Sequence, residues 1–184
     1  MVLLSYAIPG VEEGEAMSTG TLTQAIDILI GGVGKVGKTT FIRTISQYTD
    51  NAHSDGWFTG QVQIDEGLDA HFIEPPATPY FDFHWQRDLI ADADVHGMIV
   101  VCDSTRPDNF GEMIAILETI RAFHPDMPCV LAANKQDQTQ AWSAEDIRVA
   151  LGIPDSIPVM PCIATDLNSV GNVVVRVLEE IWRA

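Results

Sequence analysis

The stretch at residues 32–40, Gly-Val-Gly-Lys-Val-Gly-Lys-Thr-Thr, constrains this chain more than any other. It follows an apolar run at residues 26–30 and leads into a helix-like segment at residues 41–48. Gly-x-x-x-x-Gly-Lys-Thr between a strand and a helix is the phosphate-binding P-loop. The glycines let successive backbone N–H groups face one anion, and the helix N-terminus adds the positive end of its dipole. The pattern predicts a nucleoside triphosphate site and leaves the base and the reaction open.

The predicted phosphate contacts come from the backbone of the loop and from two side chains. We expect Lys38 to reach the terminal phosphates and to act in catalysis, and the Thr39 hydroxyl to bind Mg²⁺. Lys35 is expected to point to solvent or to a partner. The complete predicted set is Gly32, Val33, Gly34, Lys35, Val36, Gly37, Lys38, Thr39 and Thr40.

Short apolar strands alternate with amphipathic helices along the rest of the chain. Strands are expected at residues 25–30, 61–64, 68–74, 98–101, 129–133 and 159–163, and helices at 41–48, 82–93, 108–123, from Ser143 and at 168–182. A tight turn at Asp65-Glu66-Gly67 predicts one early hairpin. The pattern predicts a three-layer α/β fold with a mostly parallel sheet and one antiparallel edge strand. Residues 1–22 are expected to form a flexible acidic tail, and residues 23–184 a single domain.

The tetrapeptide Asn134-Lys135-Gln136-Asp137 follows the apolar strand at residues 129–133. A carboxylate there can accept from the ring N–H and the exocyclic amine of guanine, whereas adenine offers no such pair of donors. Each charge-assisted hydrogen bond contributes about 1.5–3 kcal/mol. The Lys135 stem can cover the base, and Asn134 can tie this segment to the P-loop. Alone the tetrapeptide also fits a polar turn, but together with a P-loop it predicts a guanine nucleotide.

The two motifs together resemble those of the Ras-like small GTPase superfamily, and the chain is most similar to its prokaryotic MglA-type branch. The resemblance runs from about Ala25 to the C-terminus and implies a P-loop G domain that binds GTP or GDP with Mg²⁺. Ile163, Ala164 and Thr165 match the family's later guanine loop, usually Ser-Ala-Lys, where Ala164 would donate its backbone N–H to the guanine carbonyl. The resemblance also implies a regulator protein of the Roadblock/LC7 type and polarity or motility effectors.

The segment after the strand at residues 68–74 departs from the family pattern. The family usually has Asp-x-x-Gly-Gln, and this chain has Glu74-Pro75-Pro76-Ala77-Thr78. Glu74 is expected to reach Mg²⁺ through water and Ala77 to offer its backbone N–H to the terminal phosphate, but Thr78 cannot orient the attacking water. The prolines stiffen a segment that should move when the phosphate is lost. Intrinsic hydrolysis is therefore expected to be slow or absent.

Further candidate residues come from the loops, one of which is expected at residues 49–60, where the chain is polar and contains glycine. Thr59 is the favoured choice for a threonine that senses Mg²⁺ and the terminal phosphate, with Thr49 and Ser54 as alternatives. Arg87 and Arg106 are candidates for a charge-stabilising group supplied in cis. Surface ion pairs or solvated guanidinium groups are the ordinary explanation for both arginines.

The net charge of −16, from 10 basic and 26 acidic residues, is expected to repel nucleic acids and anionic membranes. This charge is explained either by solubility alone or by a partner protein with a basic contact face. No apolar run approaches the roughly 20 residues of a membrane helix, and neither end shows a lipid-anchor motif. The three cysteines, Cys102, Cys129 and Cys162, lie far apart and are expected to be buried, reduced thiols of a cytoplasmic protein.

Three functions compete at this point. The first is a GTP/GDP switch with slow intrinsic hydrolysis that signals to partner proteins. The second is a GTP-binding interaction module with little or no hydrolysis, motivated by residues 74–78. The third is a P-loop ATPase or kinase in which Asp103 is the Mg²⁺-linked acid, and residues 134–137 argue against it.

Overall fold

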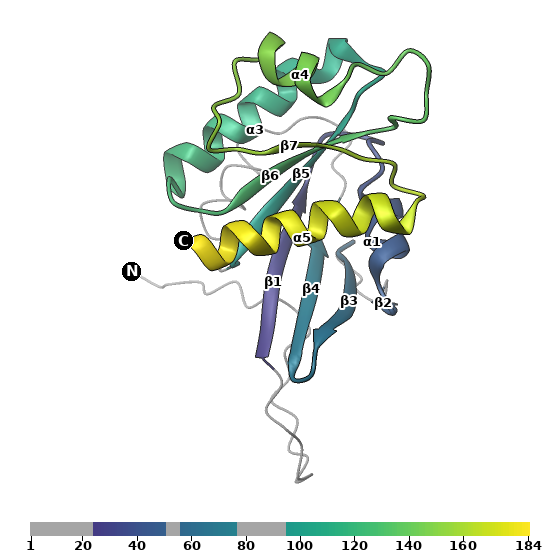
Figure 1. Cartoon of the computed structure of the whole chain (residues 1–184), viewed down its shortest axis with the longest axis vertical. Coiled ribbons are helices and arrows are strands. Elements are labelled where there is room, and N and C mark those ends of the chain that lie inside the picture. The colour runs from purple at the N-terminus through teal and green to yellow at the C-terminus, as the bar shows by residue number, and fades with distance from the viewer. Residues whose placement is uncertain (1–23, 51–55, 77–94) are drawn as a thin grey trace, which may run out of the picture.

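The structure is a computed structural model that describes residues 24–50, 56–76 and 95–184. Within these ranges seven strands form one sheet in the order β2-β3-β4-β1-β5-β6-β7 (Figure 1). The strands are β1 (Gln24–Gly31), β2 (Tyr48–Asp50), β3 (Phe58–Asp65), β4 (Leu68–Glu74), β5 (Gly97–Asp103), β6 (Cys129–Asn134) and β7 (Val159–Pro161). The described helices are α1 (Lys38–Ile45), α3 (Phe110–Phe123), α4 (Ala144–Ala150) and α5 (Leu167–Arg183), with a 3₁₀ turn at Pro107–Asn109.

The sheet is mainly parallel, as the alternation of strands and helices predicts. β1 pairs in parallel with β4 and β5, and β5, β6 and β7 continue the parallel arrangement. β3 runs antiparallel to both of its neighbours, β2 and β4. The expected hairpin is therefore β3–β4, and the short β2 lies outside it at the edge of the sheet.

Each face of the sheet carries its own hydrophobic core, because alternate strand residues point to opposite faces. Ile26, Ile28 and Ile30 of β1 pack with residues of α1 and α5 on one face. Leu29 packs on the other face with residues of α3 and α4. Figure 1 shows α5, in yellow, crossing one face of the sheet with α1 beside its first turns. The three-layer α/β prediction is confirmed.

The first helix and the polar segment after it differ from the sequence prediction. α1 ends at Ile45 rather than near Tyr48, since Ser46 adopts an extended conformation (φ −82°, ψ 140°). Tyr48–Asp50 then forms β2, and β3 begins at Phe58, so the prediction of a loop across residues 49–60 was wrong at both ends. All three residues of β2 are exposed. The strand therefore lacks the apolar alternation by which a strand is recognised in sequence.

The later elements agree more closely with the prediction. The Ser143 hydroxyl accepts a hydrogen bond of 3.1 Å from the Asp146 backbone N–H and caps α4, as expected. Gly67, with φ 79°, closes the turn between β3 and β4. The strand expected at residues 159–163 ends at Pro161. The helix expected at residues 82–93 and the N-terminal tail lie outside the described residues.

Candidate functional site

The P-loop joins β1 to α1 and depends on three glycines with positive φ. Gly32, Gly34 and Gly37 have φ values of 137°, 70° and 107°, which other residues rarely adopt. At Gly32 an added Cβ would overlap the carbonyl oxygen of Val101, and at Gly37 it would overlap the amide nitrogen of Asn134. Two of the three glycines are therefore required both for backbone conformation and for space.

Helix α1 begins at Lys38, directly after the loop. Its N-cap, Gly37, has no side chain to bond the N–H groups of the first turn, and that turn holds no acidic residue. A helix N-terminus of this kind attracts an anion, because its N–H groups and the positive end of its dipole point outward. This local structure supports the predicted role of the loop in phosphate binding.

Lys38, Thr39 and Glu74 come together beside the loop. The Thr39 hydroxyl donates to Glu74 Oε2 at 2.7 Å, and the Lys38 ammonium lies 3.8 Å from Glu74 Oε1. Lys38 Nζ also donates to the Gly34 carbonyl at 3.1 Å. Lys38 and Glu74 are both buried, with 7% and 8% of their surface exposed. Burial lowers the pKa of the Lys38 ammonium, and attraction to Glu74 opposes this shift without cancelling it.

Asn134, at the start of the guanine segment at residues 134–137, bonds both the P-loop and the loop after β7 that contains Ala164. Its amide nitrogen donates to the Val36 carbonyl at 2.7 Å, and its amide oxygen accepts from the Ala164 backbone N–H at 2.8 Å. The predicted tie between Asn134 and the P-loop is confirmed. The Ala164 N–H, which was expected to serve the guanine carbonyl, is already engaged by Asn134. A bound base would have to share or replace that partner.

Lys135 contacts Asp103, the last residue of β5. Its ammonium donates to Asp103 Oδ2 at 2.5 Å, and Thr105 donates to Asp103 Oδ1 through its backbone N–H at 3.0 Å and its hydroxyl at 2.6 Å. Burial acts to raise the pKa of the Asp103 carboxyl, but these hydrogen bonds together lower it below its ordinary value. This pair was not among the contacts predicted from the sequence. The shared end of the two parallel strands was the signal, since Asp103 pairs in register with Asn134.

The other predicted guanine-binding residues lie in the same region. Asp137 is exposed, and it accepts from Gln138 Nε2 at 2.6 Å. The Ile163 backbone N–H donates to the Ser169 hydroxyl at 2.8 Å, and Thr165 is exposed. The Gln136 N–H donates to the Cys162 carbonyl at 3.1 Å, which joins the segment after β6 to the one after β7.

The remaining candidates are not brought to the loop by the described structure. Thr59 lies within β3, opposite Ile73 of β4, and not in a loop as expected. Arg106 is exposed and pairs with Asp108 at 3.1 Å, so it forms the ordinary surface ion pair. Ala77 and Arg87 lie outside the described residues.

The cysteines and histidines offer no metal chemistry within residues 24–50, 56–76 and 95–184. No group of three metal-ligating side chains with suitable geometry occurs there. Cys102, Cys129 and Cys162 are buried and free, as expected. Burial raises the pKa of Cys102 and Cys129 to about 12 and that of Cys162 to about 11, so the thiols remain protonated.

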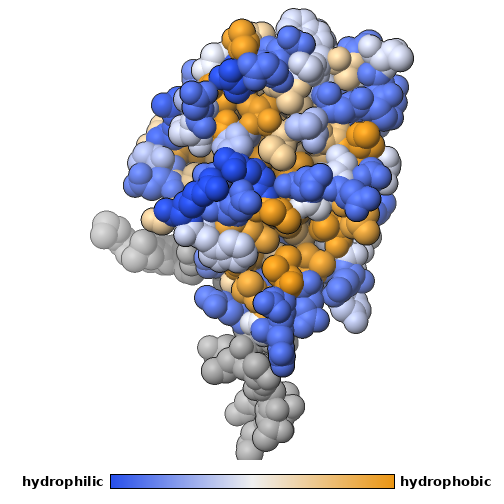
Figure 2. Space-filling view, in the orientation of Figure 1, coloured by the Kyte–Doolittle hydropathy of each residue, from blue (hydrophilic) through white to orange (hydrophobic). Residues whose placement is uncertain are grey.

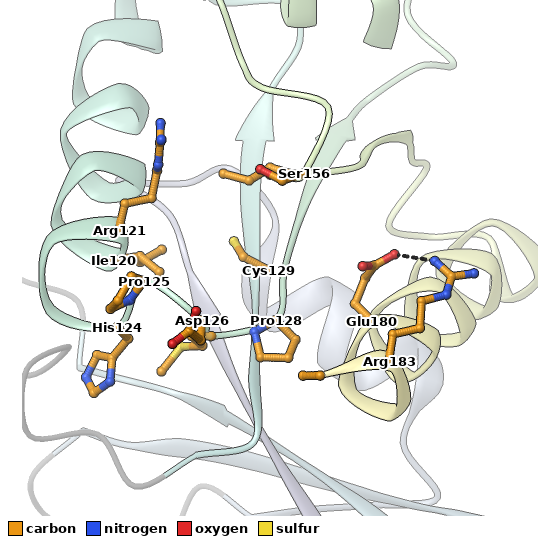
Figure 3. A pocket seen from close by; sticks show the side chains of 13 residues that line it. Ile120, Arg121, His124, Pro125, Asp126, Pro128, Cys129, Ser156, Glu180 and Arg183 are labelled. Atoms are coloured by element: carbon orange, nitrogen blue, oxygen red, sulfur yellow. Dashed lines mark hydrogen bonds and ion pairs between the residues drawn. The ribbon is translucent and has the colours of Figure 1, made fainter.

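A cavity of about 240 Å³ lies near the start of β6, at the end of the sheet opposite the P-loop. The C-terminal ends of α3 and α5 form its sides, and Cys129 lies between them (Figure 3). Charges of both signs line its rim, where Glu180 pairs with Arg183 at 2.8 Å. The length of β6 separates the cavity from the predicted nucleotide site. Because its rim carries both acidic and basic side chains, the cavity does not indicate a class of ligand.

Comparison with known proteins identifies the fold. No family model matches the chain. The Arl6 (BBS3) small GTPase from Trypanosoma brucei with bound nucleotide analogue GppNp has a TM-score of 0.68 at 17% identity, covering 87% of this chain and 99% of that one. The G domain of the T. maritima FeoB iron transporter has a TM-score of 0.64 at 19% identity, covering 85% and 99%. This chain has a G-domain fold.

A curated relative agrees with this G-domain assignment. Mouse ADP-ribosylation factor-like protein 10 is 24% identical over 129 residues, which are 69% of this chain and 52% of that protein. The chain therefore spans about half the length of this relative. In the described part of the G domain, no helix has the length and hydropathy that crossing a bilayer requires.

Proposed function

We propose that this G domain belongs to a Ras-like small GTP-binding protein that alternates between GTP-bound and GDP-bound states. The observation that carries the proposal is the pair of hydrogen bonds made by the Asn134 amide. They join the P-loop at Val36 to the predicted guanine loop at Ala164. One buried amide thus links the predicted phosphate site to the predicted base site. The likeness to small GTPases supports the same reading at the level of fold.

The residues beside Lys38 fit a magnesium ion. The hydroxyl of Thr39 and the carboxylate of Glu74 lie within hydrogen-bond distance, and Mg²⁺ prefers oxygen ligands of this kind. We expect Thr39 to bind the ion directly and Glu74 to hold it through water. Bound there with a triphosphate, Mg²⁺ would offset the negative charge of the phosphates.

Slow hydrolysis is part of the proposal, and residues 74–78 motivate it. Glu74 ends β4, and Pro75 and Pro76 follow it directly. Thr78 stands where a glutamine would orient the attacking water, so a regulator that completes the site would matter more than usual. The alternative, a GTP-binding module without hydrolysis, rests on the same segment. An ATPase in which Asp103 holds Mg²⁺ is disfavoured, since Lys135 and Thr105 bond its carboxylate and Glu74 contacts Thr39.

The branch of the superfamily and the partner proteins are proposed from the sequence resemblance alone. We infer a cytoplasmic protein of the prokaryotic MglA-type branch, regulated by a Roadblock/LC7-type protein and acting on polarity or motility effectors. Tyr48 of β2 is exposed at the edge of the sheet and is a candidate contact for such partners.

Equilibrium titration with fluorescent GTP, GDP and ATP tests the nucleotide assignment. We expect GTP and GDP to bind much more tightly than ATP, and Asp137→Asn to shift preference from GTP to xanthosine triphosphate. Asp126→Asn, an exposed change near the opposite end of the sheet, is the matched control. Equal competition by ATP and GTP in the parent protein would refute the assignment.

Single-turnover hydrolysis of labelled GTP separates the switch from the non-hydrolysing module. We expect a slow rate that exceeds the buffer control and rises when a cognate regulator is added. A rate equal to the buffer control under both conditions would leave the binding module as the correct function.

A further inference from the structure

Asp103, the last residue of β5, and the two residues after it contact the predicted guanine segment, residues 134–137, at several points. Asp103 Oδ2 accepts from the Lys135 ammonium, and the Ser104 backbone N–H donates to the Asn134 carbonyl at 3.0 Å. The Ser104 hydroxyl accepts from Gln136 Nε2 at 2.9 Å. We call residues 103–105 the β5 brace. Three successive residues of the guanine motif are thus each bonded to the brace.

Gln136 extends the brace toward Trp142. Its side-chain nitrogen also donates to the Trp142 carbonyl at 2.8 Å, while the Trp142 N–H donates to the Ser104 carbonyl at 2.8 Å. The Trp142 ring in turn packs edge-on against Phe110 of α3, with ring centres 5.8 Å apart. The guanine segment is therefore connected through the brace to the core on the α3 side of the sheet.

Asp103 is the charged centre of the brace. Its side chain is 4% exposed, whereas that of Lys135 is 37% exposed, so Asp103 is the buried partner of the pair. A buried carboxylate is tolerated only with compensating bonds, and Thr105 supplies two on the oxygen that Lys135 leaves free. Lys135 itself has φ 69°, an unusual value for a residue with a side chain. The side chain that extends from this unusual backbone position is the one that bonds Asp103.

We propose that Asp103 is a positioning residue for base recognition, which acts through Lys135 to hold the guanine segment in its binding conformation. This role rests on the proposed function. It differs from the role of a Mg²⁺-linked acid, because Lys135 and Thr105 already bond both oxygens of Asp103. Asp103 contributes to the choice of base and leaves the handling of phosphate and Mg²⁺ to Lys38, Thr39 and Glu74.

The test compares nucleotide affinities of full-length Asp103→Asn with the parent protein. We expect the GTP-over-ATP selectivity ratio to fall about tenfold, within the range of coupling seen between contacting groups. The Mg²⁺ concentration at half-maximal GTP binding should stay unchanged. Asp108→Asn is the matched control, since Asp108 is exposed nearby and its carboxylate pairs with Arg106 at the surface. It should alter neither quantity.

A double-mutant cycle with Lys135→Met decides whether Asp103 acts through Lys135. In the Lys135→Met background, Asp103→Asn should cause little further loss of selectivity. Thr105→Val, which removes one bond to Asp103 and keeps the carboxylate, gives a milder variant if Asp103→Asn folds poorly. It should lower selectivity in the same direction by a smaller factor.

Each other outcome overturns the inference. Unchanged selectivity in Asp103→Asn and Thr105→Val excludes a role in base recognition. A shifted Mg²⁺ midpoint with intact selectivity assigns Asp103 to the metal instead, and an undiminished effect in the Lys135→Met background shows that it does not act through Lys135. A parent protein that binds ATP as well as GTP refutes the proposed function itself, which distinguishes that failure from failure of the brace.

Discussion

Replacing Asn134 by alanine should destabilise the protein even without nucleotide. Asn134 is 3% exposed, and its amide makes two buried hydrogen bonds, to the Val36 carbonyl and from the Ala164 N–H. Alanine leaves both backbone groups without these partners. These groups belong to two segments, the P-loop and the loop after β7, that are distant in sequence.

The magnitude follows from the two orphaned groups. Each buried polar group left unsatisfied costs about 1–3 kcal/mol, so the pair costs about 2–6 kcal/mol, with entry of water favouring the lower end. Domains of this size are typically stable by only about 5–15 kcal/mol. The substitution should therefore remove a large share of the free energy of unfolding.

Urea unfolding followed by tryptophan fluorescence measures this loss. The midpoint should fall while the slope with denaturant concentration stays unchanged, as for a two-state domain. Asn168→Ala, an exposed change in the first turn of α5, is the control and should stay within about 0.5 kcal/mol of the parent. A loss below about 1 kcal/mol for Asn134→Ala would show that the two hydrogen bonds do not hold the loops together.

Two further predictions concern Gly37 and pH. Gly37→Ala should reduce GTP binding at least tenfold in a fluorescence titration, because a Cβ there is strained at φ 107° and overlaps the Asn134 amide. Gly171→Ala in α5 is the control and should leave GTP binding intact, because a Cβ at that position meets no other atom within 4 Å. Since the folded-state pKa of Asp103 is below the ordinary 3.8, its ion pair stabilises the fold fully above that pH, and this contribution is lost as the pH falls toward the lowered value. The stability difference between the parent and Asp103→Asn in urea titrations should thus shrink from neutral pH to about pH 3, and a difference that grows would contradict the sign of the shift.

The layers of the fold and the P-loop can be predicted from the sequence because both depend on local patterns. Apolar runs such as residues 26–30 and the amphipathic spacing of α5 survive in the structure, where Ile28 and Val173 are fully buried. The edge of the sheet could not be predicted. β2 is exposed throughout and is held by main-chain pairing with β3, which side-chain patterns do not report. On the face shown in Figure 2, apolar side chains reach the surface next to strongly hydrophilic ones.

In the candidate site, too, some contacts could be predicted from the sequence and others could not. The tie from Asn134 to the P-loop could be predicted, since the motif places a short amide at the end of a strand beside the loop. Asp103 and Lys135 lie at the ends of neighbouring parallel strands, but their contact also depends on the register of β5 against β6, which the sequence does not fix. Thr59 was assigned to a loop because residues 49–60 are polar, yet β3 includes it. Pairing between strands, rather than the type of residue, decides these positions.

The pairing of Glu74 with both Lys38 and Thr39 has a consequence for how charge enters the site. Lys38 and Glu74 form a nearly neutral couple within a chain of net charge −16. A triphosphate that approaches alone would add several negative charges next to a buried carboxylate, and the two would compete for one ammonium. A divalent cation between Glu74 and the phosphates removes this conflict and leaves Lys38 to the anion. Nucleotide and cation should therefore enter as a thermodynamically coupled pair, each raising the affinity for the other by the same factor.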